Sequence, residues 1–125
     1  MGRSSRPTVY WKFEVLCFDR QTGKILWQRT AREEVPHEAY RQADGGYACY
    51  SPLTDGTHVY AYFGSRGLFC YDLEGNRKWE RELGKMSIVM QFGEGGSPAL
   101  VGDKLIVNRD QEGKSAILAL NKNTG

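Results

Sequence analysis

The sequence predicts an all-β fold made of four-stranded antiparallel sheets that repeat along the chain. Turn-forming dipeptides such as Asp55-Gly56 and Gly102-Asp103 recur at intervals too short for long helices. Between such turns lie short runs of β-branched and aromatic residues, of which 57–63 is the clearest. A third observation, a motif that returns after about 50 residues, indicates that the sheets are copies of one unit.

The repeated motif joins an acidic or amide residue, a glycine and a tryptophan at nearly constant spacing. Trp27 and Trp79 are 52 residues apart, and Gly75 and Gly125 are 50 residues apart. Units of roughly 40–50 residues are typical of four-stranded propeller blades and of some helical solenoids, and the strand-like runs favour blades. The three copies are Cys17-x-Asp19-x-x-x-Gly23-x-x-x-Trp27, Cys70-x-Asp72-x-x-Gly75-x-x-x-Trp79 and Ala119-x-Asn121-x-x-x-Gly125.

The individual elements follow in order from these anchors. After an N-terminal arm at 1–12, the first unit supplies only the last two strands of a blade within 13–31. The second unit, 48–83, is a full blade, and the third unit, 97–125, lacks its fourth strand. Successive strands joined by tight turns form an antiparallel meander. The expected strands are 13–19, 24–31, 48–54, 57–63, 67–72, 76–83, 97–101, 104–109 and 115–121.

Each position of the motif has a structural role that follows from its chemistry. A tryptophan on an outer strand can lie flat against the next blade, where its indole N–H needs a carbonyl acceptor. The glycine four residues earlier suits a turn with positive φ or a close backbone approach. Asp19, Asp72 and Asn121 end the third strand and can accept hydrogen bonds from turn amides, as in an Asx-turn. The position occupied by cysteine, cysteine and alanine calls for a small buried side chain.

The motif resembles the tryptophan-docking repeat of the quinoprotein, or PQQ-like, β-propeller family. The best copy is Cys-x-Asp-Arg-Gln-Thr-Gly-Lys-Ile-Leu-Trp at 17–27, and 121–125 repeats its front half. The second copy has a turn that is one residue shorter, and cysteine replaces the family's usual alanine in two copies. The resemblance covers nearly all of 13–125 and implies four-stranded antiparallel blades of a PQQ-like β-propeller, here a partial and open array.

The resemblance also implies that further blades complete the ring. A closed propeller needs at least about four blades, whereas 13–125 holds about two and a half. Open sheet edges and a bare blade face would otherwise promote aggregation. We therefore expect a piece of a larger protein whose remaining blades are its partners, with a tryptophan near position 129 of the continuing chain. Closure by several copies of this chain is the alternative.

Composition and charge exclude several classes of function. With 17 basic and 15 acidic residues the net charge is +2, which does not indicate a nucleic-acid surface. No apolar run is long enough for a membrane helix, and 1–7 lacks the apolar core of a signal peptide. The residues alone leave the compartment open, and the family resemblance implies a periplasmic or extracellular protein.

Candidate binding residues lie mainly in the long links between units, at 32–47 and 84–96. His37 stands near carboxylates, in a setting that serves acid–base chemistry, metal binding or simple loop packing. Arg66 and Arg109 occupy corresponding loops of two units, where an arginine either binds an anionic ligand or stays solvated or locally paired. The candidate ligand- or partner-binding residues are His37, Arg41, Asp44, Arg66, Gln91 and Arg109.

The sequence lacks the residues that a quinone cofactor site requires. In the enzymes of the resembled family, a tryptophan and a disulfide between adjacent cysteines hold the quinone, and carboxylate and amide groups bind calcium. Cys17, Cys49 and Cys70 are far apart, and no Cys-x-x-Cys or His/Cys cluster indicates a metal site. We therefore expect no catalytic, cofactor or metal residue in this segment; pyrroloquinoline quinone (PQQ) and calcium are implied by the resemblance alone.

These observations favour a non-catalytic propeller segment that acts as a scaffold or binds a ligand or protein through its loops. Two other functions stay open: a segment of a quinone-dependent alcohol or sugar dehydrogenase, and a propeller like that of an outer-membrane protein assembly factor. In either case Met86, Met90 and Phe92 are expected to cover the end of the channel or to pack between blades.

Overall fold

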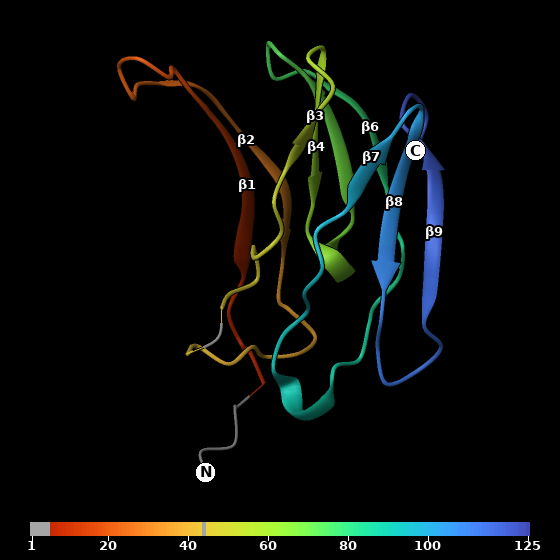
Figure 1. The fold of residues 1–125 in the computed structure, drawn as a ribbon. Coiled ribbons are helices and arrows are strands. Elements are labelled where there is room, and N and C mark those ends of the chain that lie inside the picture. Colours follow the sequence, from red (N-terminus) through yellow and green to blue (C-terminus); the bar gives the residue numbers. More distant parts are fainter. Residues whose placement is uncertain (1–5, 44) are drawn as a thin grey trace.

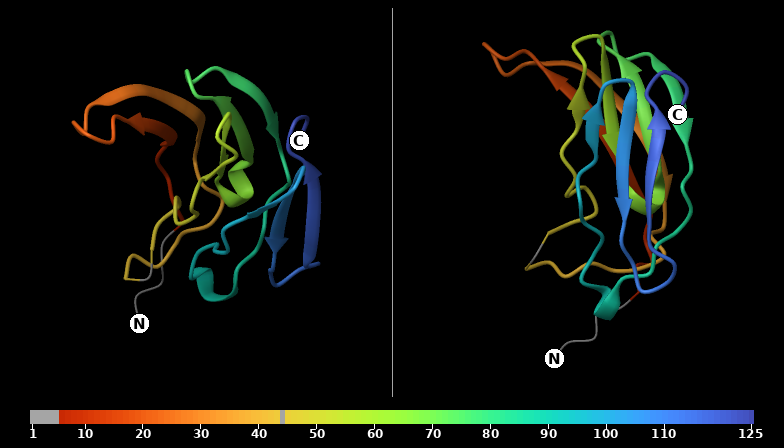
Figure 2. Two further views of the ribbon diagram at one scale, coloured as in Figure 1. Left: turned by 45° about the horizontal axis from the view of Figure 1, so that its top comes forward. Right: turned by 45° about the vertical axis from the view of Figure 1, so that its right-hand side comes forward.

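The computed structural model describes residues 6–43 and 45–125, which form three antiparallel sheets (Figure 1). The first sheet pairs β1 with β2, the second has the order β3-β4-β5-β6, and the third has the order β7-β8-β9. Figure 2 shows the sheets side by side, like neighbouring sectors of a fan. The predicted all-β fold of antiparallel blades is therefore confirmed. The strands are β1 (Trp11–Phe18), β2 (Ile25–Glu34), β3 (Leu53–Thr54), β4 (His58–Tyr62), β5 (Leu68–Asp72), β6 (Arg77–Arg81), β7 (Ala99–Val101), β8 (Lys104–Arg109) and β9 (Ala116–Asn121), with short 3-10 turns η1 (Gly64–Arg66) and η2 (Val89–Gln91).

The strands follow the predicted order, and the differences lie at their ends. β8 has the predicted bounds, whereas β3 is reduced to two residues from the expected 48–54. Pro52 has no amide hydrogen, and the amide of Ser51 donates to Ser97 Oγ (2.9 Å) instead of to a neighbouring strand. β1 starts earlier and β2 ends later than predicted, so the first pair of strands is longer than the motif alone implies.

The middle sheet is buried on both faces, because alternate side chains of its strands belong to two different cores. In β5, Leu68 and Cys70 face the third sheet, whereas Phe69 and Tyr71 face the first. This double burial explains why the inner strands β4 and β5 read as apolar runs, whereas the outer strand β6 is mostly polar and exposed. The core between the first and second sheets contains Phe13, Val15, Ala31, Ala61, Phe63, Phe69 and Tyr71. The core between the second and third sheets contains Tyr50, Tyr60, Tyr62, Leu68, Cys70, Leu105 and Val107.

Each motif tryptophan lies against the turn of the following unit. The indole N–H of Trp27 donates to the carbonyl of Leu73 (2.8 Å), and that of Trp79 donates to the carbonyl of Lys122 (3.0 Å). A Cβ atom placed on Gly75 would lie only 2.7 Å from Cδ2 of Trp27, and the corresponding glycine of the third unit is approached equally closely. Glycine is thus required both by the close ring and by its own positive φ of 82°.

The motif aspartates close the turns that carry these glycines, as the sequence predicts. Asp19 Oδ1 accepts hydrogen bonds from the amides of Gln21 (3.0 Å) and Thr22 (2.7 Å). Asp72 Oδ1 accepts a corresponding bond from the amide of Asn76 (2.8 Å). Hydrogen bonds from these turn amides lower the pKa of both carboxyls, because they favour the charged form.

The small side chain of the motif is fully buried only in the middle blade. Cys70 is 1% exposed, and burial raises the pKa of its thiol to about 11. Cys17 is half-buried, and Ala119 is exposed on the face of the third sheet that no further sheet covers. The expected burial at this position is therefore complete in only one of its three copies.

Candidate functional site: the link surface

The two long links between units lie together at one end of the sheets, at the bottom of Figure 1. We call residues 35–41 and 86–94 the link surface. His37 Nε2 lies 2.6 Å from the carbonyl oxygen of Met86, so that the ring N–H donates across the two links. Of the alternatives for His37, the structure has it packed between loops.

The pairing continues along both links, so they form one surface instead of two independent loops. Each bond joins a residue of the first link to one about 50 positions later, which shows that corresponding segments of adjacent units run in the same direction. The bonds run from the amide of Ile88 to Glu38 Oε2 (3.1 Å), from the amide of Ala39 to Gln91 Oε1 (3.4 Å), and from the amide of Arg41 to the carbonyl of Phe92 (3.4 Å).

A buried carboxylate anchors the second link to the middle blade. Glu94 Oε2 accepts hydrogen bonds from the amide of Ser65 (2.7 Å) and the hydroxyl of Tyr50 (3.2 Å), and Oε1 accepts one from the hydroxyl of Ser65. Nη1 of Arg66 lies 3.2 Å from Oε1, so the buried negative charge is paired. Burial is the main cause that raises the pKa of Tyr50, and the nearby charge of Glu94 raises it further. The carboxylate therefore fixes the position of the link relative to η1.

Arg66 lies inside this arrangement, not at an exposed loop tip. Its side chain is 2% exposed, and its guanidinium lies over the rings of Tyr47 and Phe13, 4.8 Å and 5.5 Å from their centroids. Glu34 Oε1 is a second carboxylate, 3.9 Å from Nε. Of the roles left open for Arg66, the structure shows local pairing. Its guanidinium points toward Glu94 and Tyr47 and not toward solvent.

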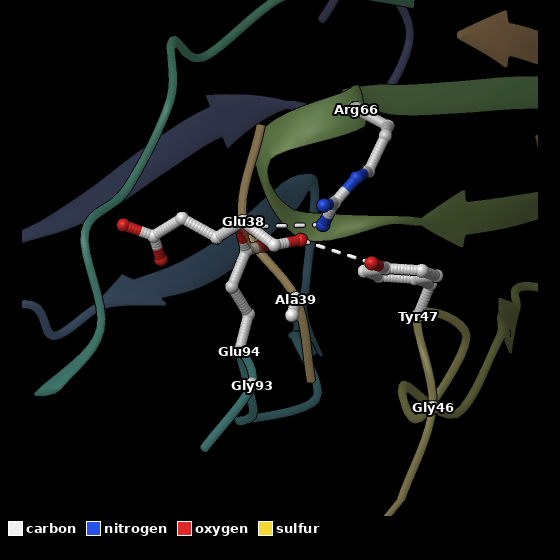
Figure 3. Close-up of a pocket in the computed structure, with 7 residues that line it drawn as sticks. All are labelled: Glu38, Ala39, Gly46, Tyr47, Arg66, Gly93 and Glu94. Carbon is white, nitrogen blue, oxygen red and sulfur yellow. Dashed lines mark hydrogen bonds and ion pairs between the residues drawn. The ribbon is translucent and has the colours of Figure 1, made fainter. Parts of the chain in front are cut away.

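Figure 3 shows the cavity where both links meet Arg66. The hydroxyl of Tyr47 donates to the carbonyl of Glu38 (2.9 Å) across it. The cavity encloses about 10 Å³, which is the order of a single water molecule. It is therefore too small for a substrate. Its lining consists of Glu38, Ala39, Gly46, Tyr47, Arg66, Gly93 and Glu94.

The most exposed part of the link surface is η2 and the residue after it. Val89, Met90 and Phe92 are 48%, 70% and 41% exposed. Met90 and Gln91 have φ values of 51° and 55°, a left-handed conformation that residues with side chains adopt rarely and that often accompanies binding sites. Of the two alternatives expected for these residues, packing is seen for Met86, which is 2% exposed, and not for Met90 and Phe92; that these two cover the end of the channel stays a prediction. The path of the link turns these two side chains outward, and no local pattern in the sequence signals that path.

The remaining candidate residues lie in different places. Arg109 donates to the carbonyls of Leu83 and Gly84 (2.8 Å to Gly84), where the second link leaves the sheet. The guanidinium of Arg41 lies over the ring of Phe92, 5.5 Å from its centroid. Asp44 lies outside the described residues. The structure therefore brings His37, Arg41 and Gln91 together on the link surface and places Arg66 and Arg109 where the links join the sheets.

The described residues do not fit the quinone and calcium site implied by the resemblance. Cys17, Cys49 and Cys70 are free thiols, and no two of them are adjacent. Both motif tryptophans are engaged at contacts between units, and Trp11 packs edge-on against Tyr47 with ring centroids 5.3 Å apart. Across residues 6–43 and 45–125, no group of three His, Cys, Asp or Glu side chains is placed to hold a metal ion.

Comparison with known proteins identifies the family but no individual relative. No curated protein matches the chain. Among the residues with described structure, none forms a helix with the length and apolar character needed to cross a bilayer. The family model described as "Outer membrane protein assembly factor BamB" matches residues 8–125, a range that includes all three sheets and the link surface. The chain therefore belongs to this family of PQQ-like repeat proteins.

Proposed function

We propose that the chain is a non-catalytic segment of a β-propeller that docks a protein partner on the link surface. The observation that carries the proposal is the exposed apolar turn at Val89–Gln91, continued by Phe92. Methionine and aromatic residues are enriched at the centres of protein interfaces, and the flexible thioether of Met90 adapts well to an apolar pocket. The matched family description names an assembly factor of outer-membrane proteins, which favours a protein partner over a small-molecule substrate.

The support beneath this turn favours binding as well. The first link is bonded to the second along its length, and Glu94 ties the second link to η1. A turn held in this way loses little conformational freedom when a partner binds, so less of the interaction energy is offset by ordering. The left-handed φ values at Met90 and Gln91 indicate that the surrounding contacts maintain an unfavourable local conformation.

The proposal also includes the setting in which the segment acts. We place it in the periplasm, with the remaining blades of a larger propeller as its structural partners and no resident cofactor. The family resemblance implies a periplasmic or extracellular protein, and the matched family description names an outer membrane protein assembly factor; both support this setting. A role as part of a quinone-dependent dehydrogenase is the competing function, and the same experiment addresses it.

The test substitutes Met90→Asp and measures binding of the 125-residue chain to purified outer-membrane barrel assembly machinery by biolayer interferometry. We expect the affinity to fall at least about tenfold, because a carboxylate would have to be buried in an apolar contact. The matched control is Leu73→Asp, since Leu73 is a 50% exposed apolar residue in the β5–β6 turn, at the other end of the sheets (Figure 1). Leu73→Asp should bind normally.

Two results would contradict the proposal. The first is binding that is unchanged by Met90→Asp or equally weakened by Leu73→Asp. The second is dye-linked oxidation of an alcohol or sugar by the chain after addition of PQQ and Ca²⁺, at a rate above that of the cofactor alone. The second result would favour the dehydrogenase function.

A further inference from the structure

An open cleft with a mixed polar and apolar lining lies between the first and second sheets, where β2 faces the β5–β6 turn. It has a volume of about 400 Å³, within the usual range for sites that bind small molecules. None of its lining residues belongs to the link surface, so it is a separate feature of the molecule. The lining consists of Arg29, Thr30, Tyr71, Gly75, Asn76 and Arg77.

Two arginines cross this cleft in opposite directions. Arg29 extends from β2 and donates from Nε to the carbonyl of Gly75 in the second sheet (2.7 Å). Arg77 extends from β6 and donates from Nη1 to the carbonyl of Ala31 in β2 (3.4 Å). A guanidinium has five N–H donors, so each group keeps donors that these backbone carbonyls do not use. The carbonyls position the two cations without neutralising them.

The positive charge of the cleft is compensated only in part. None of the described residues that line it is acidic. Arg77 pairs with Glu80 (2.7 Å), but the two side chains are 46% and 56% exposed, and surface pairs of this kind are weak and exchange readily. Arg29 has no ion pair with any residue that the structure describes. An anion entering the cleft would therefore meet two guanidinium groups and no fixed carboxylate in the lining.

A buried hydroxyl beside these cations lacks a hydrogen-bond partner. Tyr71 is 2% exposed, and its hydroxyl is unpartnered among the described residues. Burial raises the pKa of Tyr71 despite the nearby charges of Arg77 and Arg29, so the hydroxyl keeps its proton and needs an acceptor. Arginine has only donors and cannot supply one. The hydroxyl therefore needs an acceptor, and the nearby charges of Arg77 and Arg29 favour an anionic one.

We propose that this cleft binds an oxyanion of the phosphate class, either free or as the headgroup of a lipid. The proposal is independent of partner docking on the link surface. Arginine matches phosphate through paired N–H donors with favourable geometry, and two arginines approach here from opposite sides. The bound oxyanion accepts hydrogen bonds from both guanidinium groups and from the Tyr71 hydroxyl.

The test titrates the 125-residue chain with inorganic phosphate at constant ionic strength and follows NMR chemical shifts. A parallel titration with chloride serves as the reference. We expect saturable binding with a Kd on the order of 1 mM or tighter. Arg77→Gln and Tyr71→Phe should each weaken it, by about tenfold for the arginine. Tyr71→Phe keeps the packed ring and removes only the unpartnered hydroxyl, so it tests the site in a variant that should stay folded.

Arg81→Gln is the matched control. Arg81 follows Trp79 by two residues, as Arg29 follows Trp27, and it is exposed but does not line the cleft. It should bind phosphate like the unsubstituted chain. Far-UV circular dichroism of each variant checks that a lost signal is not lost folding.

A parallel titration with glycerol phosphate and with phosphatidylglycerol vesicles separates the two sources. Binding of glycerol phosphate that is lost in Arg77→Gln supports a free ligand, and binding of vesicles alone with the same loss supports a lipid headgroup. The proposal is overturned if neither phosphate nor vesicles bind. It is also overturned if binding is unaffected by both cleft variants, or falls equally in Arg81→Gln.

Discussion

Replacement of Gly75 by alanine tests the contact on which the stacking of units depends. Gly75 has a φ of +82°, and an added Cβ would lie 2.7 Å from Cδ2 and 2.9 Å from Cγ of Trp27. The ring cannot withdraw freely, because its N–H donates to the carbonyl of Leu73 in the same turn. Gly23 is a matched control: it has the same motif position and a φ of +72°, but nothing lies within 4 Å of its added Cβ.

The two substitutions should differ by the contribution of the tryptophan ring. A left-handed backbone costs about 1–2 kcal/mol for a residue with a Cβ, and this applies to both sites. At Gly75 the overlap with the ring adds about 1–3 kcal/mol, the usual cost of overpacking. We expect the free energy of unfolding to fall by about 2–5 kcal/mol in Gly75→Ala and by about 1–2 kcal/mol in Gly23→Ala.

Urea unfolding followed by tryptophan fluorescence and far-UV circular dichroism measures both losses, with linear extrapolation to zero denaturant. The slope should be similar in the two variants, since neither changes the surface exposed on unfolding. Equal losses at Gly75 and Gly23 would refute the reasoning, because the close approach of the ring would then contribute nothing to stability.

Three further predictions concern buried charge and a buried thiol. The hydrogen bond from Lys122 to Asp55 (2.9 Å) lowers the pKa of the Asp55 carboxyl in the folded chain. The ionised Asp55 therefore stabilises the fold above about pH 4, and this contribution is lost as the pH falls through the lowered pKa. Asp55→Asn should flatten the acid side of the curve of unfolding free energy against pH. Glu94→Gln should lower the free energy of unfolding, measured with urea, by about 3–5 kcal/mol, because it leaves the buried Arg66 without its nearest carboxylate. The double variant Glu94→Gln/Arg66→Met should regain part of the lost free energy. A double variant no more stable than Glu94→Gln would contradict the pairing. Cys70, with a pKa of about 11, should react with a thiol reagent at pH 8 only on unfolding. Because Cys17 and the exposed Cys49 are also free thiols, the test uses the chain with Cys17→Ser and Cys49→Ser, and rapid labelling of Cys70 in that native chain would disprove its burial.

The parts of the fold that were predictable are those set by local chemistry. The spacing of Asp72, Gly75 and Trp79 predicts a turn that is closed by a side-chain acceptor, followed by an outer strand, and the structure has both. The indole acceptor was also predictable in kind, since a half-buried N–H needs a carbonyl. Its identity was not, because the carbonyl of Lys122 belongs to another unit.

The candidate site was predictable only as two stretches of chain. The links at 32–47 and 84–96 were recognisable by their length, but the bonds between them join residues about 50 positions apart. Arg66 could equally have faced solvent, and its burial depends on Glu94, 28 residues later in the sequence. Short-range patterns carry no information about such pairs.

The sequence by itself determined the repeat, the all-β class and the turn chemistry, because periodic side chains and turn residues act within a few positions of the backbone. Only the tertiary structure decided which side chains of the links point outward and where charges meet. Met86 and Met90 are alike in the sequence, yet one is 2% and the other 70% exposed. Arg29 and Arg77 face one cleft because two sheets stack. Burial and charge pairing depend on contacts between units, and these exist only when the sheets are packed together.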